Sequence, residues 1–267
     1  MVETARQRCL RQIGVLMRPN SRNTQHMKQT RHAWQDGDNL FVIRIGKTTN
    51  KKIALPQDKI VQTYTFSMEQ VRYIQQCDAD GIKPSQKTFY SFDAANCMDC
   101  PLSGNSGNGK CYTHKYMQFS GFISMLRSII RQGWGSRLDA EMRADICKWT
   151  EGNFVRFGTY GEPSLLPIDL VGDMVLGAKS WTGYTHQSRK PWAQPFKAFF
   201  MASAHSEKDA VSMTGWRSFI AEDDTSSTNA VQCPASKESS FASHCAKCGL
   251  CSGITGKGNK NVKIATH

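Results

Sequence analysis

The sequence contains no long run of uncharged apolar residues. No segment approaches the roughly eighteen consecutive apolar residues that a membrane-spanning helix requires, and the first residues lack the apolar core of a secretion signal. We therefore expect a protein of the cytoplasm that makes no contact with a membrane. The glycine-rich segment 103–109 is not followed by Lys-Ser or Lys-Thr, which argues against a phosphate-binding P-loop, and neither a Ser-His-Asp pattern nor an internal repeat is present.

Acidic residues are also few relative to basic ones. The 267 residues include 22 Asp and Glu against 34 Lys and Arg, which gives a formal net charge of +12. Such a surplus favours polyanionic partners such as a nucleic acid or a nucleotide, although a protein that is merely basic has the same composition. With 39% hydrophobic residues the chain can bury a core, so disorder throughout is excluded.

The charge is uneven along the chain and indicates three regions. Residues 1–52 contain eleven Lys and Arg against three Asp and Glu, and residues 18–30 show little apolar periodicity. We interpret residues 1–50 as a basic, partly flexible arm with a short strand at 41–45, residues 51–230 as the main domain, and residues 231–267 as a cysteine-rich segment. The arm can contact nucleic acid phosphates or be an ordinary terminus.

Short β-type runs alternate with helical patterns over the main domain. The clearest helix covers 119–130, where apolar residues recur at spacings of three, four and seven, and two more are expected at 165–175 and 207–216. This alternation predicts an α/β fold with parallel strands, a partial (β/α) barrel of about six strands. The expected strands lie at 88–92, 154–157, 180–185, 198–203, 217–221, 230–232 and 262–265.

The ten cysteines are the most informative residues. Cys9, Cys77 and Cys147 are scattered, whereas the other seven form two groups: Cys97, Cys100 and Cys111, and Cys233, Cys245, Cys248 and Cys251. In a reducing compartment, clustered cysteines more often bind metal than form disulfides. The sequence therefore predicts a metal protein.

The C-terminal group has the pattern of an iron–sulfur site. Cys245, Cys248 and Cys251 follow one another at three-residue spacing, and eleven residues separate Cys245 from Cys233, which is followed by proline. Ferredoxin-type [4Fe–4S] sites combine such a triplet with a distant Cys-Pro. Structural zinc is the alternative, although zinc more often takes its ligands from two separated Cys-x-x-Cys pairs.

The first group leaves its fourth ligand undecided. Cys97 and Cys100 are separated from Cys111 by ten residues, and His114 follows three residues later. If His114 is a ligand, the group closes into a Cys₃His zinc site with a structural role. If it is not, one position stays open for an exogenous ligand, and the site can do chemistry.

The order of these parts resembles radical S-adenosylmethionine enzymes. In that family a three-cysteine loop follows the first strand of a partial barrel, and a Gly-Gly-Glu-Pro-like segment ends the second strand. Here a run at 88–92 precedes the first cysteine group, and Tyr-Gly161-Glu162-Pro follows the run at 154–157. The resemblance implies an open [4Fe–4S] cluster at the first group, contacts of Gly161 and Glu162 with S-adenosylmethionine, and an auxiliary cluster at the second group. The cysteine spacing departs from the family's Cys-x-x-x-Cys-x-x-Cys.

Residues 88–267 are also similar to uncharacterised bacteriophage proteins. The shared segments are the Cys-Pro and Cys-Tyr loop, Gly-Thr-Tyr-Gly-Glu-Pro, Gly-Tyr-Thr-His-Gln, and the Cys-Pro-Ala-Ser-Lys-Glu end with its three cysteines. This resemblance implies a viral origin, and hence the cytoplasm of a host cell.

Two histidines complete the candidate site. His186 and His205 follow two expected strands, and ligands of open α/β folds bind at the carboxyl ends of parallel strands. Our leading hypothesis is an iron–sulfur protein that modifies a nucleotide or nucleic acid, with His186 and His205 lining the substrate space. The alternative is a non-catalytic zinc protein that binds nucleic acid or a host protein.

Overall fold

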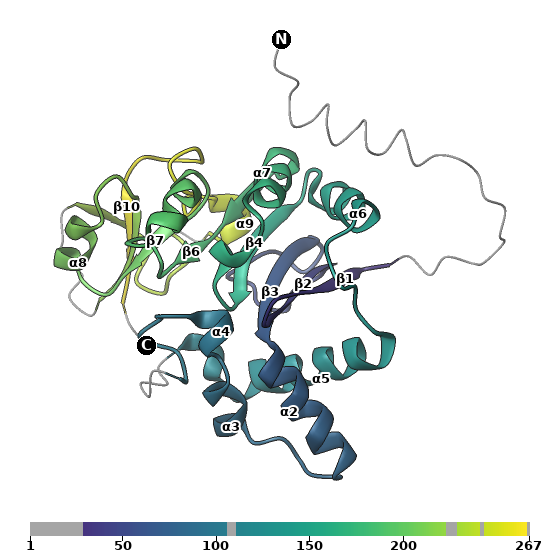
Figure 1. The fold of residues 1–267 in the computed structure, drawn as a ribbon. Helices are drawn as coiled ribbons and strands as arrows, with labels where there is room; N and C mark the ends of the chain where they lie inside the picture. Colours follow the sequence, from purple (N-terminus) through teal and green to yellow (C-terminus); the bar gives the residue numbers. More distant parts are fainter. Residues whose placement is uncertain (1–28, 106–110, 223–228, 241–242, 266–267) are drawn as a thin grey trace, which may run out of the picture.

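The computed structural model describes residues 29–105, 111–222, 229–240 and 243–265, which form a mixed α/β structure with two five-stranded sheets (Figure 1). The first sheet contains β1 (Arg31–Asp36), β2 (Asn39–Gly46), β3 (Ile60–Ser67), β4 (Phe154–Tyr160) and β5 (Ser180–Thr182), in that order. β1 is antiparallel to β2, and β2 to β3, whereas β4 is parallel to both β3 and β5.

The second sheet is parallel throughout. Its order is β6 (Tyr184–Thr185), β7 (Met201–Ala204), β8 (Ser218–Ala221), β10 (Asn261–Ile264) and β9 (Ala230–Gln232). The last strand in the chain, β10, therefore pairs between β8 and β9.

Gly183 alone separates β5 from β6, so residues 180–185 pass directly from one sheet to the other. The Gly183 N–H donates to the carbonyl of Cys251 at 3.1 Å, and its own carbonyl accepts from the Met201 N–H at 3.0 Å. A Cβ atom at this position would lie 2.4 Å from the Phe200 ring. The crossing point therefore requires a glycine because the Phe200 ring packs against its backbone.

Helices cover both faces of the first sheet. In Figure 1, α6 and α7 lie above the sheet and α2 and α5 lie below it. The helices are α2 (Met68–Ala79), α3 (Gln86–Ser91), α4 (Ala94–Cys97), α5 (Tyr116–Gln132), α6 (Ala140–Thr150), α7 (Ile168–Gly177), α8 (Glu207–Ser212) and α9 (Cys245–Cys248), with 3₁₀ turns η1 (Tyr112–His114), η2 (Pro163–Leu165) and η3 (Pro191–Ala198).

An aromatic cluster joins the sheet to the helices below it. The ring centroid of Phe66 lies 5.7 Å from that of Phe122 on α5 and 5.2 Å from that of Tyr160 at the end of β4. α2 begins directly after β3 with a capping box, in which the side chains of Ser67 and Gln70 each accept a bond from the other's backbone N–H. The Gln70 amide also donates to the Tyr160 hydroxyl at 2.6 Å, so the end of β4 is fixed against α2.

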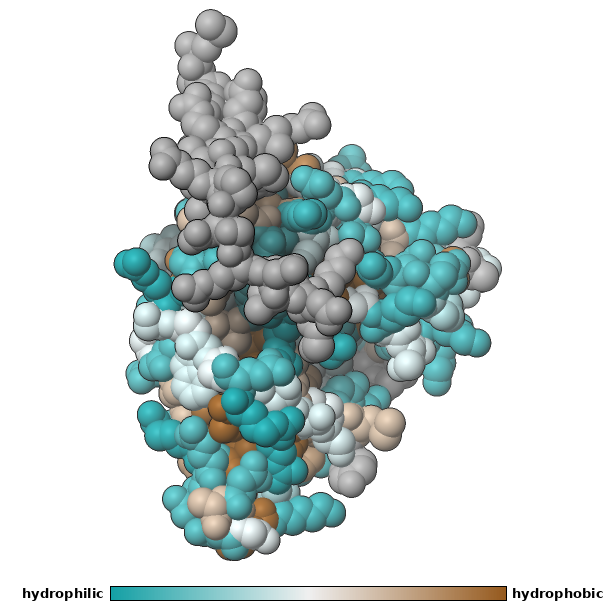
Figure 2. Space-filling view, turned by 90° about the vertical axis from the view of Figure 1, so that its right-hand side faces the viewer, coloured by the Kyte–Doolittle hydropathy of each residue, from teal (hydrophilic) through white to brown (hydrophobic). Residues whose placement is uncertain are grey.

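The face shown in Figure 2 carries mainly hydrophilic side chains, with small hydrophobic areas between them. In the part of the chain that the structure describes, no helix has the length and apolar character that crossing a lipid bilayer requires.

Several predicted elements are confirmed. The predicted strands at 41–45, 154–157, 217–221, 230–232 and 262–265 correspond to β2, β4, β8, β9 and β10, and the predicted helix at 119–130 lies within α5. The predicted run at 180–185 is divided into β5 and β6. The predicted strand at 198–203 begins later, at Met201, after η3.

The strand predicted at 88–92 is wrong, because these residues belong mainly to helix α3. Ser85 caps this helix by accepting from the Thr88 N–H at 3.4 Å, and the consecutive residues Phe89 and Tyr90 are both buried in the aromatic cluster. In a strand, consecutive side chains point to opposite faces, so Phe89 and Tyr90 could not both pack on the side that faces α5. The strand that precedes the first cysteine group is instead β3.

Two further helix predictions need shorter bounds. Pro163 begins the 3₁₀ turn η2, and α7 starts only at Ile168, while α8 ends at Ser212 and not at 216. We did not predict β1, β3, α2, α4 or α6 from the sequence. Residues 31–46, which we placed in the basic arm, form two strands of the first sheet, and residues 1–28 lie outside the described part of the chain.

Candidate metal centres

The first cysteine group lies in a loop that the backbone closes. Cys97 ends α4, Cys100 follows in a turn whose N–H donates to the Cys97 carbonyl at 3.2 Å, and Cys111 precedes η1. The Cys111 N–H donates to the carbonyl of Leu102 at 3.1 Å. The ten residues between Cys100 and Cys111 therefore form a loop whose ends lie close together, because Cys111 is bonded to Leu102, two residues after Cys100.

Asp93 organises this loop. Its carboxylate is fully buried and accepts from the backbone N–H groups of Gly104 and Asn105, each at 2.9 Å. Burial raises the pKa of Asp93, although the two backbone bonds and His114 act in the opposite direction. The Asp93 carboxylate thus holds the loop and α4 together.

The three thiols of this group lie close enough for their charges to interact. Burial raises the pKa of Cys97 well above its usual value, and Asp93, Cys100 and Cys111 raise it further. Burial likewise raises the pKa of Cys100 to about 12, and it raises that of Cys111. Cys97, Cys100 and Cys111 therefore lie within electrostatic reach of one another, and their binding of one metal centre stays a prediction.

His114 packs beside this group. Its ring stacks on Tyr90 with centroids 3.9 Å apart, and its Nε2 lies 3.9 Å from a carboxylate oxygen of Asp93. His114 thus lies near Asp93. A Cys₃His site that His114 completes stays a prediction.

Gly161 and Glu162 lie directly against the first cysteine group. The Glu162 N–H donates to the carbonyl of Asn96, the residue before Cys97, at 2.7 Å. Gly161 has a positive φ of 77°, and a Cβ atom there would lie 2.6 Å from the Thr65 carbonyl oxygen. The close packing of β4 on β3 and α4 therefore requires a glycine at position 161 whatever else it contacts.

The Glu162 side chain is bonded within the protein. It is 4% exposed, and its carboxylate accepts from the Ser164 N–H at 3.1 Å, the Ser164 hydroxyl at 2.6 Å and the His186 N–H at 3.1 Å. Burial raises its pKa, and these bonds act against the increase. Glu162 thus joins the end of β4 to the end of β6, next to Cys97 and Cys100, whose pKa values it also affects.

His186 and His205 lie together at the ends of β6 and β7, as predicted. Their rings stack with centroids 5.5 Å apart. Burial and, to a smaller extent, the neighbouring His205 lower the pKa of His186 to about 4. His186 is therefore neutral at pH 7 and can accept or donate a hydrogen bond.

Four buried polar atoms near these strand ends have no hydrogen-bond partner among the described residues. They are Asn96 Oδ1, both amide atoms of Gln187 and the Ser188 hydroxyl. Asn96 is in α4 beside Cys97, while Gln187 and Ser188 follow His186. Since buried polar groups are nearly always bonded, such atoms indicate where a ligand or ordered water binds.

The second cysteine group is held by three backbone bonds from distant segments. The N–H groups of Cys233 and Cys245 donate to the carbonyls of Lys263 and Lys52, each at 2.9 Å, while the Cys251 carbonyl accepts from Gly183. Burial raises the pKa of Cys233, of Cys245 (to about 11) and of Cys251. The charge of Cys248 also raises each of these pKa values, so the four thiols lie within electrostatic reach of one another.

Arg156, in the middle of β4, lies between the two groups. Its guanidinium donates to the Tyr112 hydroxyl at 3.0 Å, and Tyr112 directly follows Cys111. Burial lowers the pKa of Arg156, but Tyr112 and Cys245 favour its charge and leave the pKa raised. Arg156 therefore contacts the segment of the first cysteine group and interacts with Cys245 of the second, a relationship for which the sequence carries no signal.

None of the described cysteines forms a disulfide. Within residues 29–105, 111–222, 229–240 and 243–265, no three His, Cys, Asp or Glu side chains are arranged as ligands of one metal ion.

Comparison with known proteins adds no assignment. The chain matches no protein-family model, and no curated protein or solved structure is significantly similar to it.

Replacing Gly161 with alanine should destabilise the protein more than replacing Gly152. Both glycines have a positive φ, 77° and 67°, but a Cβ at Gly152 meets nothing within 4 Å. Gly152→Ala should reduce the free energy of unfolding by about 1 kcal/mol, the cost of the backbone conformation alone. Gly161→Ala should cost about 2 kcal/mol more because Thr65 must move. Equal losses in urea unfolding would contradict the close packing.

Acidification should destabilise the protein through His186. Its pKa is about 4 in the folded state and 6.5 in the unfolded state, so between these values only the unfolded chain takes up the proton. The free energy of unfolding should fall by about 1–2 kcal/mol between pH 7 and pH 5 because of this residue alone. In urea titrations at the two pH values, the free energy of unfolding should fall less for His186→Asn than for the wild type, and the difference should be that amount. If the variant and the wild type lose the same amount, His186 is not buried as described.

Proposed function

We propose that the protein is a cytoplasmic iron–sulfur protein that resembles radical S-adenosylmethionine enzymes and acts on a nucleotide or nucleic acid. In this proposal Cys97, Cys100 and Cys111 hold a catalytic-type [4Fe–4S] cluster. A second cluster is held by Cys233, Cys245, Cys248 and Cys251. The viral origin that the second resemblance implies, and with it a host cytoplasm, belongs to the same proposal.

The observation that carries the proposal is that seven buried or half-buried thiols form two groups, each with its members within electrostatic reach of one another. In each group, ionised thiols would repel one another and raise each other's pKa, and Asp93 and Glu162 add to this at the first group. The metal cations of a bound centre attract the thiolates and offset their mutual repulsion. The thiol donor set is the one that iron–sulfur clusters use, and a cluster distributes its four ligands over separate iron atoms.

The strand arrangement supports the resemblance at the level of the fold. β3, β4 and β5 are parallel neighbours, and the chain continues through Gly183 into the five parallel strands of the second sheet. A parallel run of this kind is what a partial (β/α) barrel requires. The first cysteine group follows β3 in the chain, and Gly161 and Glu162 end its neighbour β4, which corresponds to the family's order of parts.

The strand ends also supply groups that suit a polar ligand beside the first cysteine group. A bound S-adenosylmethionine would supply a carbon–sulfur bond that one-electron reduction cleaves. Gly161 and Glu162 are proposed to contact it, with the unpartnered amide of Gln187 and the carbonyl oxygen of the Asn96 side chain as further bonding groups. His186 and His205 would line the adjacent substrate space, and the net charge of +12 favours a substrate with phosphates.

The metal proposal is tested by loading the two groups separately. Protein purified without oxygen should be brown and contain about eight iron atoms per chain, four for each cluster. The triple variant Cys97→Ala, Cys100→Ala, Cys111→Ala should lose about half of the iron, and Cys245→Ala, Cys248→Ala, Cys251→Ala the other half. Cys77→Ala with Cys147→Ala is the matched control and should retain all of it. Colourless protein with about two zinc ions per chain would establish the zinc alternative instead.

The catalytic part of the proposal needs a separate measurement. With dithionite as the electron donor, the loaded protein should cleave S-adenosylmethionine to methionine and 5′-deoxyadenosine, and Cys97→Ala should abolish both products. Loaded protein that forms neither product would reject the enzyme proposal and leave the cluster proposal in place.

A further inference from the structure

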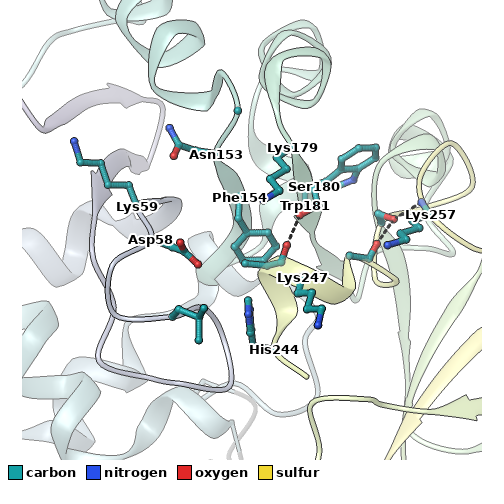
Figure 3. A pocket seen from close by; sticks show the side chains of 15 residues that line it. Asp58, Lys59, Asn153, Phe154, Lys179, Ser180, Trp181, His244, Lys247 and Lys257 are labelled. Atoms are coloured by element: carbon teal, nitrogen blue, oxygen red, sulfur yellow. Dashed lines mark hydrogen bonds between the residues drawn. The ribbon is translucent and has the colours of Figure 1, made fainter. Parts of the chain in front are cut away.

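A pocket of about 490 Å³ opens at the edge of the first sheet opposite to the candidate catalytic face (Figure 3). Its walls come from the segment before β3, the turn before β4, the start of β5 and the second cysteine segment. Since β3, β4 and β5 are parallel, these residues lie at the amino ends of the strands, whereas Gly161 and Glu162 lie at the carboxyl end of β4. The pocket is therefore separate from the strand ends that carry the proposed chemistry.

The pocket is strongly basic. Four lysines line it, Lys59, Lys179, Lys247 and Lys257, against the single carboxylate of Asp58. All four lysines are exposed, and none forms an ion pair with another residue that the structure describes. Three segments that are far apart in the sequence, the one before β3, the start of β5 and the second cysteine segment, thus contribute unpaired positive charge to one cavity (Figure 3).

His244 adds a ring nitrogen to the charged groups of this cavity. Its Nδ1 atom is buried and has no hydrogen-bond partner among the described residues. In Figure 3 its ring lies near Asp58 and Lys247 at the lower edge of the pocket. A buried ring nitrogen of this kind requires a partner that the protein itself does not provide.

We propose that this pocket binds the phosphate groups of a nucleotide or a nucleic acid strand. Lysine ammonium groups pair with phosphate oxygens as point charges, and His244 supplies a bonding group that the chain leaves unused. The volume is within the range of small-ligand sites, and the exposed lysines can follow a longer chain of phosphates onto the surface. The inference goes beyond the metal proposal, since it holds whether the cysteines bind iron, zinc or nothing.

Fluorescence anisotropy with a labelled single-stranded oligonucleotide of about twenty nucleotides tests the site, because such a strand offers more phosphates than the four lysines can contact. The triple variant Lys59→Ala, Lys179→Ala, Lys257→Ala should weaken binding at least tenfold at low salt. It should also reduce the slope of log K against log salt by about two, at roughly 0.7 for each lost phosphate contact. Lys247 is left unchanged because it lies between Cys245 and Cys248.

The matched control removes the same charge elsewhere. Lys83→Ala, Lys87→Ala, Lys208→Ala alters three exposed lysines outside the pocket and should change the affinity less than threefold. Metal content is measured for both variants, so a failure of the metal proposal is seen separately. Equal weakening by the two triple variants would mean that net charge alone drives binding and would overturn the site.

Unlabelled probes distinguish the two sources of phosphate. If a nucleoside triphosphate displaces the oligonucleotide and itself binds less tightly to the pocket variant, the site takes a free nucleotide. If only the oligonucleotide binds and depends on the pocket lysines, the site takes a nucleic acid strand. No binding of the oligonucleotide, the nucleoside triphosphate or inorganic phosphate up to millimolar concentration would overturn the proposal.

Discussion

The parallel pairing of β4 with β3 and β5 is the constraint on which the candidate sites depend. The carboxyl end of β4 meets α4 through the bond from the Glu162 N–H to the Asn96 carbonyl, which places the Gly-Glu segment beside Cys97. In the middle of the strand, Arg156 contacts Tyr112 and lies close to Cys245. At the amino end, Phe154 is part of the wall of the basic pocket. One strand thus connects the first cysteine group, the second group and the pocket.

Electrostatics explains why thiols and carboxylates that lie together in the protein suggest a bound metal centre. Burial raises the pKa of most of the clustered thiols, and the carboxylates of Asp93 and Glu162 add negative charge around the first group. Arg156 is a positive charge near both groups, and its neighbours Tyr112 and Cys245 favour that charge. A protein that gathers ionisable groups in this way either keeps the thiols protonated or offsets their charge with a bound cationic centre.

The sequence predicted the parts of this arrangement that local spacing determines. The apolar spacing at 119–130 identified α5, and the cysteine intervals identified two groups whose thiols lie within electrostatic reach of one another, while metal binding by either group stays a prediction. Features that depend on distant partners escaped it. Thr63 and Thr65 interrupt the apolar pattern of β3, yet both are buried, and residues 88–92 have strand-type composition but pack as a helix against α5. The role of Arg156 follows from strand register, which no single segment specifies.

X-ray anomalous scattering tests the central claim most directly, because it locates each metal without assuming its identity. Crystals of protein purified and grown without oxygen should give two strong peaks just above the iron absorption edge that are absent just below it. One peak should lie among the sulfur atoms of Cys97, Cys100 and Cys111, and the other among those of Cys233, Cys245, Cys248 and Cys251. Peaks that appear only above the zinc edge, or no peak at either group, would contradict an iron–sulfur protein.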